Sequence, residues 1–227
     1  MRLRHRVYYE ERGYGAHKPL NLDLTAYDPR SRLLGLFRDD QLVGAARLVF
    51  RVDQPLAAVM RAIRAVAGGV VTEQCSNTLP SEEAFDLLAA PGLRRELVDV
   101  EVGRLVVSRG AVSAGVVLKM LVATLGVLIS SQVQFYMYSS AFATARRYAI
   151  VTNPRWTLEV AERGGIDSDN FQFPLRSCAG IAVATDSPFY ESALRYASEF
   201  AKTGSIALSD ALPKHGTRVG PRTKVAV

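Results

Sequence analysis

The sequence predicts a single α/β domain with a mixed central sheet, and three observations support this fold class. Segments with strand and helix periodicity alternate along the chain. The length of 227 residues suits one compact domain, and a hydrophobic content of 48% provides a core without reaching that of a membrane protein. We assign residues 1–202 to this domain. Residues 203–227 are basic and rich in Gly, Pro, Ser and Thr, so we expect a flexible tail.

The first half of the chain predicts a helix, a hairpin, two further helices and a central strand. Gly13 ends the first helix, and Asp39-Asp40 forms the hairpin turn. Gly44 indicates a bulge or a close backbone approach in the second hairpin strand. The expected elements are a helix over 3–13, an irregular stretch over 14–32, strands over 33–38 and 41–52, helices over 55–66 and 81–90, and a strand over 97–108.

The second half predicts a buried helix and the strands that complete the sheet. The apolar run 112–129 contains Lys119 and two glycines, so a core helix is favoured over a membrane span. Pro154 marks the start of another helix. The expected elements are helices over 112–129, 154–163 and 187–202 and strands over 171–175 and 178–185. A further strand is expected at either 132–138 or 148–152.

Charged residues inside two predicted strands need an explanation. Arg47 lies in the second hairpin strand, and Glu101 and Arg104 lie three residues apart in the central strand. A half-buried charge is costly unless it meets a partner or a ligand. One interpretation is a structural ion pair of Glu101 with Arg47 or Arg104. The other is a polar pocket in the middle of the sheet.

Composition argues against several other classes of protein. The basic start of the chain is not followed by an apolar core, so no secretory signal is predicted. Cys75 and Cys178 suit a reducing cytoplasm, and the three scattered histidines predict no metal site. The net charge of +6 resides largely in the tail, and no basic face with interleaved aromatics indicates nucleic-acid binding. We expect a cytoplasmic protein without stable membrane insertion.

Several short motifs occur in an order typical of one enzyme family. They are Arg4-His5-Arg6-Val7-Tyr8 with Tyr14, then Tyr27-Asp28, Leu42-Val43-Gly44-Ala45-Ala46-Arg47-Leu48 and Glu101-Val102-Gly103-Arg104-Leu105, with Asn153-Pro154-Arg155-Trp156 and Glu162-Arg163-Gly164-Gly165-Ile166 further on. From Arg4 to about Gly180 the chain resembles bacterial acyl-homoserine lactone synthases and N-acyl amino acid synthases of the GNAT acyltransferase superfamily. The resemblance implies a GNAT-like three-layer α/β/α fold with a mixed, splayed central sheet.

The resemblance also implies the site residues. The expected catalytic residues are Glu101, Arg104 and Arg47. The expected acceptor-binding residues are Arg4, Tyr8, Tyr14 and Asp28. The expected acyl-donor-binding residues are Val106, Val107, Ser108 and Arg109, and no metal is expected. Glu101 would accept the amine proton or orient the ammonium, and the arginines would hold a carboxylate or keep Glu101 ionised. Backbone N–H groups of Val106 and Val107 would stabilise the oxyanion and receive the pantetheine arm.

Two departures from the family pattern bear on the substrates. Thr25 stands where the family has the first acid of its acidic pair, which suggests an acceptor other than S-adenosylmethionine. The phosphate-binding loop of many GNAT enzymes is blurred in residues 109–114.

The expected function is N-acyl transfer from an acyl carrier protein or acyl-CoA thioester to the amine of an amino acid or related small molecule. That thioester would be a co-substrate, and no tightly bound cofactor is expected. Two alternatives are a non-catalytic module that binds acyl ligands or carrier protein, and an acetyltransferase that uses acetyl-CoA.

Overall fold

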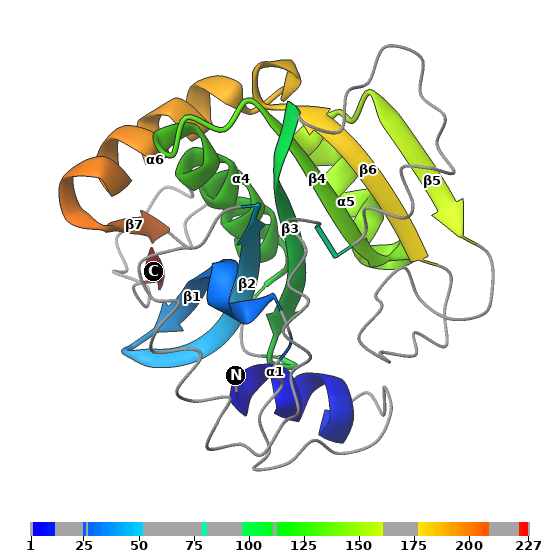
Figure 1. Cartoon of the computed structure of the whole chain (residues 1–227). Coiled ribbons are helices and arrows are strands. Elements are labelled where there is room, and N and C mark those ends of the chain that lie inside the picture. The colour runs from blue at the N-terminus through cyan, green and yellow to red at the C-terminus, as the bar shows by residue number, and fades with distance from the viewer. Residues whose placement is uncertain are drawn as a thin grey trace.

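The sheet is formed by segments from both ends and the middle of the chain (Figure 1). The computed structural model describes residues 2–11, 25, 27–51, 79–80, 97–110, 113–160, 177–208 and 223–226. The helices predicted over 55–66 and 81–90, the strand predicted over 171–175, and Tyr14 lie outside these described residues.

The described strands form one mixed sheet in the order β5-β6-β4-β3-β2-β1-β8-β7. Only β3 and β4 pair in parallel, and the other neighbours pair antiparallel. The strands are β1 (Ser31–Arg38), β2 (Gln41–Phe50), β3 (Val98–Val107), β4 (Phe135–Ala141), β5 (Trp156–Val160), β6 (Ser177–Val183), β7 (Ser205–Leu208) and β8 (Thr223–Ala226). The hairpin turns at Asp39 and Asp40, both with positive φ, and its ladder shifts register between Leu36 and Phe37, opposite Gly44. The predicted hairpin, bulge and central strand are therefore confirmed.

Helices cover both faces of the sheet, which gives the predicted three layers. On one face lie α4 (Ala114–Ser130), α5 (Phe142–Thr152) and α6 (Tyr190–Thr203); on the other lies α1 (Arg2–His5), continued by the π-helical turn η1 (Arg6–Glu11). Figure 1 shows α4 and α6 together behind the sheet and α1 near the lower end of β3. Leu48 and Val102 pack with α4 in the main core, whereas Val106 packs with η1 in a smaller one.

A bulge in β3 explains why Val106 lies on the η1 face. Strict alternation would place Val106 on the same face as Val102. Between these residues Arg104 has a φ of +52°, and the register with β2 shifts, so that Arg104 and Leu105 together oppose Ala46. Because of this extra residue, each later side chain of β3 points to the opposite face from the one that strict alternation would give it. Leu105 consequently packs against the α4 core and Val106 against η1.

Strands β3 and β4 pair only over their first halves. Their ladder runs from Val98, opposite Phe135, to Val102, opposite Tyr138. Beyond this point β3 continues to Val107 and β4 to Ala141, and the two strands diverge downward in Figure 1. The predicted splay of the sheet is confirmed, and it leaves the end of β3 paired to β2 alone among the described strands.

The chain after β4 differs from the sequence prediction at two places. Of the two alternative positions for the further strand, 132–138 corresponds to β4, whereas residues 148–152 belong to α5. The helix predicted over 154–163 is wrong, because Trp156–Val160 is strand β5. Asn153, with a φ of 45°, donates its N–H to the carbonyl of Ala149 and ends α5. Pro154 therefore follows a helix end instead of opening a helix.

The end of the chain is also more ordered than predicted. Residues 205–208 and 223–226 of the expected flexible tail form β7 and β8, which pair with each other, and β8 pairs with β1. Gly204, with a φ of 69°, ends α6 and turns the chain into β7. Isolated short strands are weak signals in a sequence, and these two depend on the exposed edge of β1 for their pairing.

Candidate active site

The strands and the first helix bring five charged side chains to the η1 side of the sheet. Arg47 comes from β2, Glu101 and Arg104 from β3, Arg4 from α1 and Asp28 from the short helix η3 (Asp28–Arg30). All five are at least 94% buried. Arg47 lies opposite Gly103, and Glu101 opposite Val49, so Arg47 and Glu101 are diagonal neighbours on one face of the ladder. Burial of this many charges requires extensive pairing.

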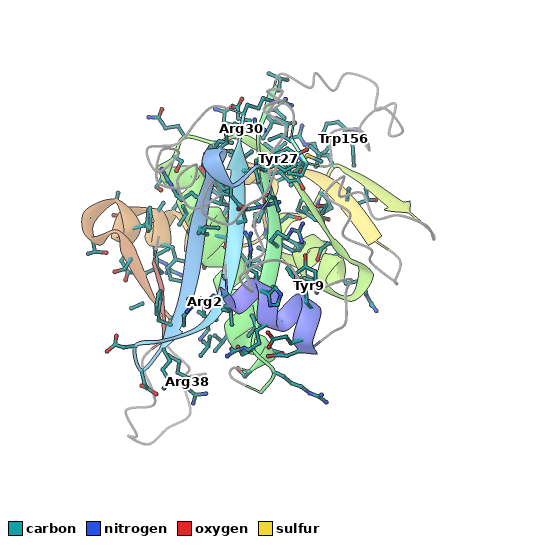
Figure 2. The ribbon with its side chains drawn as sticks, turned by 60° about the horizontal axis from the view of Figure 1, so that its bottom comes forward. Arg2, Tyr9, Tyr27, Arg30, Arg38 and Trp156 are labelled. Carbon is teal, nitrogen blue, oxygen red and sulfur yellow. The ribbon has the colours of Figure 1, made fainter. Side chains whose placement is uncertain are left out.

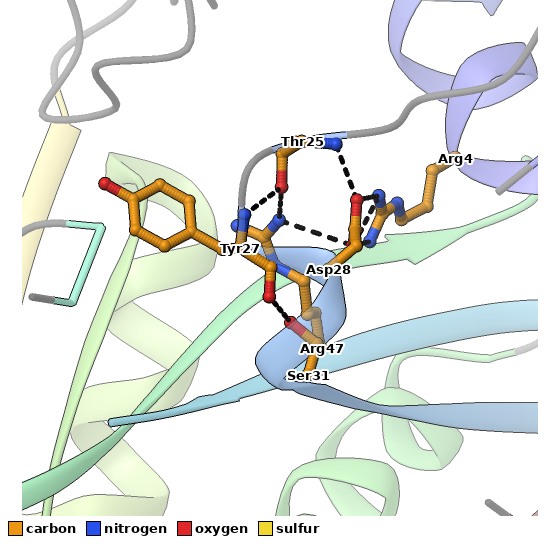
Figure 3. A network of polar contacts seen from close by, with 6 residues as sticks. All are labelled: Arg4, Thr25, Tyr27, Asp28, Ser31 and Arg47. Atoms are coloured by element: carbon orange, nitrogen blue, oxygen red, sulfur yellow. Dashed lines mark hydrogen bonds and ion pairs between the residues drawn. The ribbon is translucent and has the colours of Figure 1, made fainter. Parts of the chain in front are cut away.

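Asp28 is the centre of a polar network (Figure 3). Its Oδ1 accepts hydrogen bonds from Nη1 and Nη2 of Arg4 at 3.4 and 3.3 Å. Its Oδ2 accepts the backbone N–H of Thr25 at 2.6 Å. Nη1 of Arg47 lies 3.7 Å from Oδ1 and donates a hydrogen bond to Oγ1 of Thr25 at 2.6 Å. One carboxylate thus serves two buried guanidinium groups.

Local turn structure holds Asp28 in this position. The N–H of Asp28 donates to the carbonyl of Thr25 at 3.2 Å, and the hydroxyl of Ser31 donates to the carbonyl of Tyr27 at 2.8 Å. Tyr27 also covers Arg47, because the ring centroid lies 5.9 Å from Cζ. In Figure 2 Tyr27 lies beside Trp156. Both pack against a third apolar cluster, formed by Val49, Leu79, Val98, Met137 and Ile181.

Glu101 lies where β3 and β4 begin to separate. Its Oε1 accepts a hydrogen bond from the hydroxyl of Ser139 at 2.8 Å, and Ser139 is the first residue of β4 beyond the ladder with β3. Arg47 is bonded to Thr25 and Asp28 rather than to Glu101 within the described part of the chain. Of the two arginines considered as ion-pair partners of Glu101, Arg47 is therefore not paired with it.

Aromatic rings surround the charged group. The ring centroid of Tyr8 lies 5.6 Å from Cζ of Arg104, within the range of a cation–π contact. Tyr148 of α5 approaches from the other side. Burial raises the pKa of Tyr148 most, and electrostatic interactions with Tyr8 and Glu101 raise it further. The phenol is therefore neutral near neutral pH and remains a proton donor.

The remaining part of the predicted site follows β3 to its end. The N–H of Ser108 donates to the carbonyl of Val43 at 2.8 Å, so these two residues form a hydrogen-bonded pair. Because such pairs alternate along an antiparallel ladder, Val106 also bonds to β2, whereas the N–H and C=O of Val107 point away from β2. The hydroxyl of Ser108 accepts a hydrogen bond from Arg6 at 2.7 Å.

The helix α4 begins directly after this strand end. Arg109 and Gly110 are exposed in the intervening turn, and Gly110 has a φ of 72°. Ser113 is the N-cap, and its side chain accepts the N–H of Val116 at 3.4 Å. The first turn of α4 carries no acidic residue, so its positive end is not neutralised locally.

The structure groups the sequence-predicted residues into two sets. Arg4, Tyr8, Asp28, Arg47, Glu101 and Arg104 lie together on the η1 face, whereas Val107 and Arg109 lead from there to the start of α4. Sequence reasoning missed Ser139 as a partner of Glu101. Its only sequence signal is its position directly after residues 132–138, one of the two alternative positions for the further strand. Over the described ranges, no three metal-binding side chains gather, and no helix is long and apolar enough to cross a membrane.

Comparisons with known proteins identify the family of this chain. The model of the acetyltransferase (GNAT) domain family matches residues 3–122, which is more than half of the chain. That range contains Arg4, Asp28, Arg47, Glu101 and Arg104. None of the curated proteins matches the chain.

Solved structures of similar fold include two complexes of one synthase. BjaI, a CoA-dependent acyl-homoserine lactone synthase, in complex with SAM and isopentyl-CoA, aligns with a TM-score of 0.53 and 15% identity over 87% of this chain and 79% of its own. Its complex with MTA aligns with the same TM-score and coverage at 14% identity. FeeM, an N-acyl amino acid synthase from uncultured soil microbes, aligns with a TM-score of 0.47 and 14% identity over 82% of this chain and 90% of its own.

Proposed function

Because the chain belongs to the GNAT acetyltransferase family, we propose that it is an N-acyltransferase of the autoinducer-synthase and N-acyl amino acid synthase type. It moves an acyl group from an acyl-CoA or acyl carrier protein thioester to the amine of an amino acid or related small molecule. The observation that carries this proposal is the buried Glu101, flanked by arginines, beside the point where β3 and β4 separate.

On the donor side, the thioester arm lies along the unpaired edge of β3. The N–H of Val107 points away from β2, and it is our candidate for the donor that stabilises the oxyanion of the tetrahedral intermediate. The pantetheine amides complete the hydrogen bonding that β4 leaves unmade, in the manner of an added strand. Arg109 and the free end of α4 then meet the phosphate groups, as helix N-termini do. The acyl chain runs beside α4.

On the acceptor side, Glu101 is our candidate general base. The amine loses a proton to the carboxylate, directly or through water, and its nitrogen attacks the thioester carbonyl carbon. Collapse of the intermediate forms the amide bond and breaks the C–S bond. The leaving thiolate takes up a proton, so the products are an N-acyl amine and a free thiol. Ser139 donates a hydrogen bond to Oε1 of Glu101 and thereby orients the carboxylate.

The acyl donor is either a CoA or an acyl carrier protein thioester. BjaI is described as CoA-dependent. The net charge of +6 of this chain fits an acidic carrier protein as well. The small-molecule chemistry and the two cysteines fit a cytoplasmic bacterial enzyme.

Release of free thiol tests the proposal. The full chain is incubated with acyl-CoA and acyl carrier protein thioesters of increasing chain length and with pooled amino acids, and mass spectrometry identifies the N-acyl product. Glu101→Gln should abolish thiol release while the protein stays folded. Asp99→Asn is the matched control, because Asp99 is exposed on the same strand and should keep wild-type activity. Absence of thiol release with every donor would favour the non-catalytic binding module.

A further inference from the structure

Four hydroxyl groups lie inside the main core, on the α5 side of the sheet. They belong to Tyr136 and Tyr138 of β4 and to Tyr148 and Thr152 of α5, and all four residues are only 0–3% exposed. Among the described residues none of these hydroxyls has a hydrogen-bond partner. Burial raises the pKa of Tyr138 most and the nearby Thr152 lowers it, but the two hydroxyls do not form a hydrogen bond. Phenylalanine would fill the same space at a lower cost, because a buried hydroxyl without a partner is unfavourable.

The three phenols gather where β3 and β4 begin to separate. Tyr138 occupies the last paired position of the β3–β4 ladder, opposite Val102. The ring of Tyr148 stacks on that of Tyr138, with 4.9 Å between the centroids and 8° between the planes. Burial raises the pKa of Tyr148 most, and electrostatic interactions with Tyr136 and with Glu101 add to this rise. The tyrosine cluster, formed by residues 136, 138 and 148, therefore adjoins the reacting end of the proposed donor site.

Strand β6 leaves the space that one of these hydroxyls occupies. Gly180 pairs with Tyr138 in the antiparallel ladder of β4 and β6. A Cβ at position 180 would lie 2.4–2.6 Å from Cζ, Oη and Cε1 of Tyr138, which is closer than real Cβ atoms approach other atoms. The glycine therefore allows the hydroxyl end of Tyr138 to lie over the backbone of β6. Two strands together fix the place of this hydroxyl.

We propose that the tyrosine cluster binds an oxygen atom on the acyl chain of the donor, so that the donor is an acyl thioester with a hydroxyl or oxo group near the thioester. This inference rests on the proposed acyl transfer and adds the chemistry of the acyl group. A plain hydrocarbon chain would leave the phenols without partners, whereas a hydroxyl or carbonyl oxygen accepts two hydrogen bonds. The phenols lie in a hydrophobic core, which favours a neutral oxygen over an anion.

The position of the oxygen on the chain follows from Tyr148. This phenol interacts electrostatically with Glu101, the candidate base, so its ring lies near the reacting carbonyl. We therefore expect the oxygen within the first few carbons of the acyl chain and not at its tail. Because the phenols are buried, the chain reaches them by entering between the diverging ends of β3 and β4 and moving side chains apart.

Donors of matched shape test the inference on the wild-type chain. Thioesters of 3-hydroxyoctanoic, 3-methyloctanoic and octanoic acid, each on CoA and on acyl carrier protein, are compared by kcat/KM in the thiol-release assay with pooled amino acids. The methyl group has nearly the shape of the hydroxyl but forms no hydrogen bond. If the phenols bind the oxygen, the hydroxyacyl donor is preferred over its methyl analogue by about 5- to 50-fold, because only the hydroxyl satisfies the site. The 3-oxooctanoyl thioester then shows which of the two oxygen groups the cluster takes.

Substitutions of tyrosine by phenylalanine assign the preference to the cluster. Tyr136→Phe and Tyr148→Phe each remove one hydroxyl and should reduce the preference for the hydroxyacyl donor over its methyl analogue at least threefold. Tyr196→Phe is the matched control, because Tyr196 of α6 packs against the same core but lies outside the cluster, and it should retain the preference. Neither cluster substitution should lower the Tm of the protein without substrate, since the hydroxyl that it removes has no partner among the described residues.

The outcomes separate this inference from the proposed function. Equal kcat/KM with the hydroxyacyl and methyl donors, or a preference that survives both cluster substitutions, would overturn the inference and leave the proposed acyl transfer intact. A fall in Tm with both cluster substitutions would also overturn it, because the hydroxyls would then already be satisfied, for example by buried water. Absence of thiol release with every donor would overturn both proposals.

Discussion

Replacing Asp28 by asparagine should strongly destabilise the fold. The substitution keeps the shape of the side chain and an oxygen for the N–H of Thr25, but it leaves Arg4 and Arg47 beside a neutral amide. These side chains are 1% and 2% exposed, and Asp28 is 0% exposed. Removing one partner of a buried ion pair costs about 3–5 kcal/mol. For a chain of this size, we expect Tm to fall by roughly 6–20 °C at neutral pH, measured by calorimetry.

The matched control is the same substitution in an exposed ion pair. Asp186 accepts hydrogen bonds from Nε and Nη2 of Arg155, and the two side chains are 26% and 50% exposed. The bond from Arg155 holds the pKa of Asp186 below its ordinary value, but water screens this pair. Asp186→Asn should therefore leave Tm almost unchanged. Equal shifts for the two substitutions would refute the assignment of Asp28 as the counterion of two desolvated arginines.

Three further predictions concern packing, catalysis and ionisation. Gly126→Ala should lower the free energy of unfolding by about 1–3 kcal/mol, because the new Cβ would lie 2.9 Å from the backbone oxygen of Ala193 in α6. Gly115→Ala in the same helix should leave the free energy of unfolding unchanged, because its Cβ would come no closer than 3.7 Å to another atom, the Oγ of Ser113. Ser139→Ala should reduce kcat by about tenfold, because it removes the hydrogen bond to Glu101. Ser140→Ala should leave kcat unchanged. Equal effects of the two substitutions would contradict a role of Ser139 in positioning Glu101. Burial raises the pKa of Tyr138 to about 12. Absorbance titration should therefore find Tyr138 neutral in the folded protein at pH 11, and its contribution to stability should be lost as pH rises from 10 toward 12.

Much of the fold follows from local sequence patterns. The hairpin, the central strand and α4 have periodicities long enough to identify, and their turns carry suitable residues. Strand β5 could not be predicted in this way. Prolines are common both at the start of a helix and just beyond its end, and the local sequence does not show which of these applies to Pro154. The pairing that recruits β7 and β8 to β1 is non-local, and four-residue segments contain too little pattern to indicate it.

In the candidate site, too, local patterns predict some features and non-local pairing determines the others. Interior charges in strands identify Arg47, Glu101 and Arg104, since buried charge is rare without a purpose. The hydrogen bond from Ser139 to Glu101 depends on the register of a parallel pair formed by segments 38 residues apart in sequence. Parallel register leaves no turn in the sequence that would specify it. The sharing of Asp28 between two arginines likewise depends on how α1 and η3 pack over the sheet, which no local pattern specifies.

The bulge at Arg104 makes the length of β3 as important as its composition. A left-handed backbone at a non-glycine residue costs on the order of 1–3 kcal/mol, so this position is held by its surroundings. Deleting one residue there would restore simple alternation and turn Val106 toward α4 and Val107 toward η1. The residues beyond the deletion would be as hydrophobic as before, but each would pack against the opposite side of the sheet. Homologues that lose or gain a single residue at this point should therefore show inverted side-chain polarity for the rest of the strand.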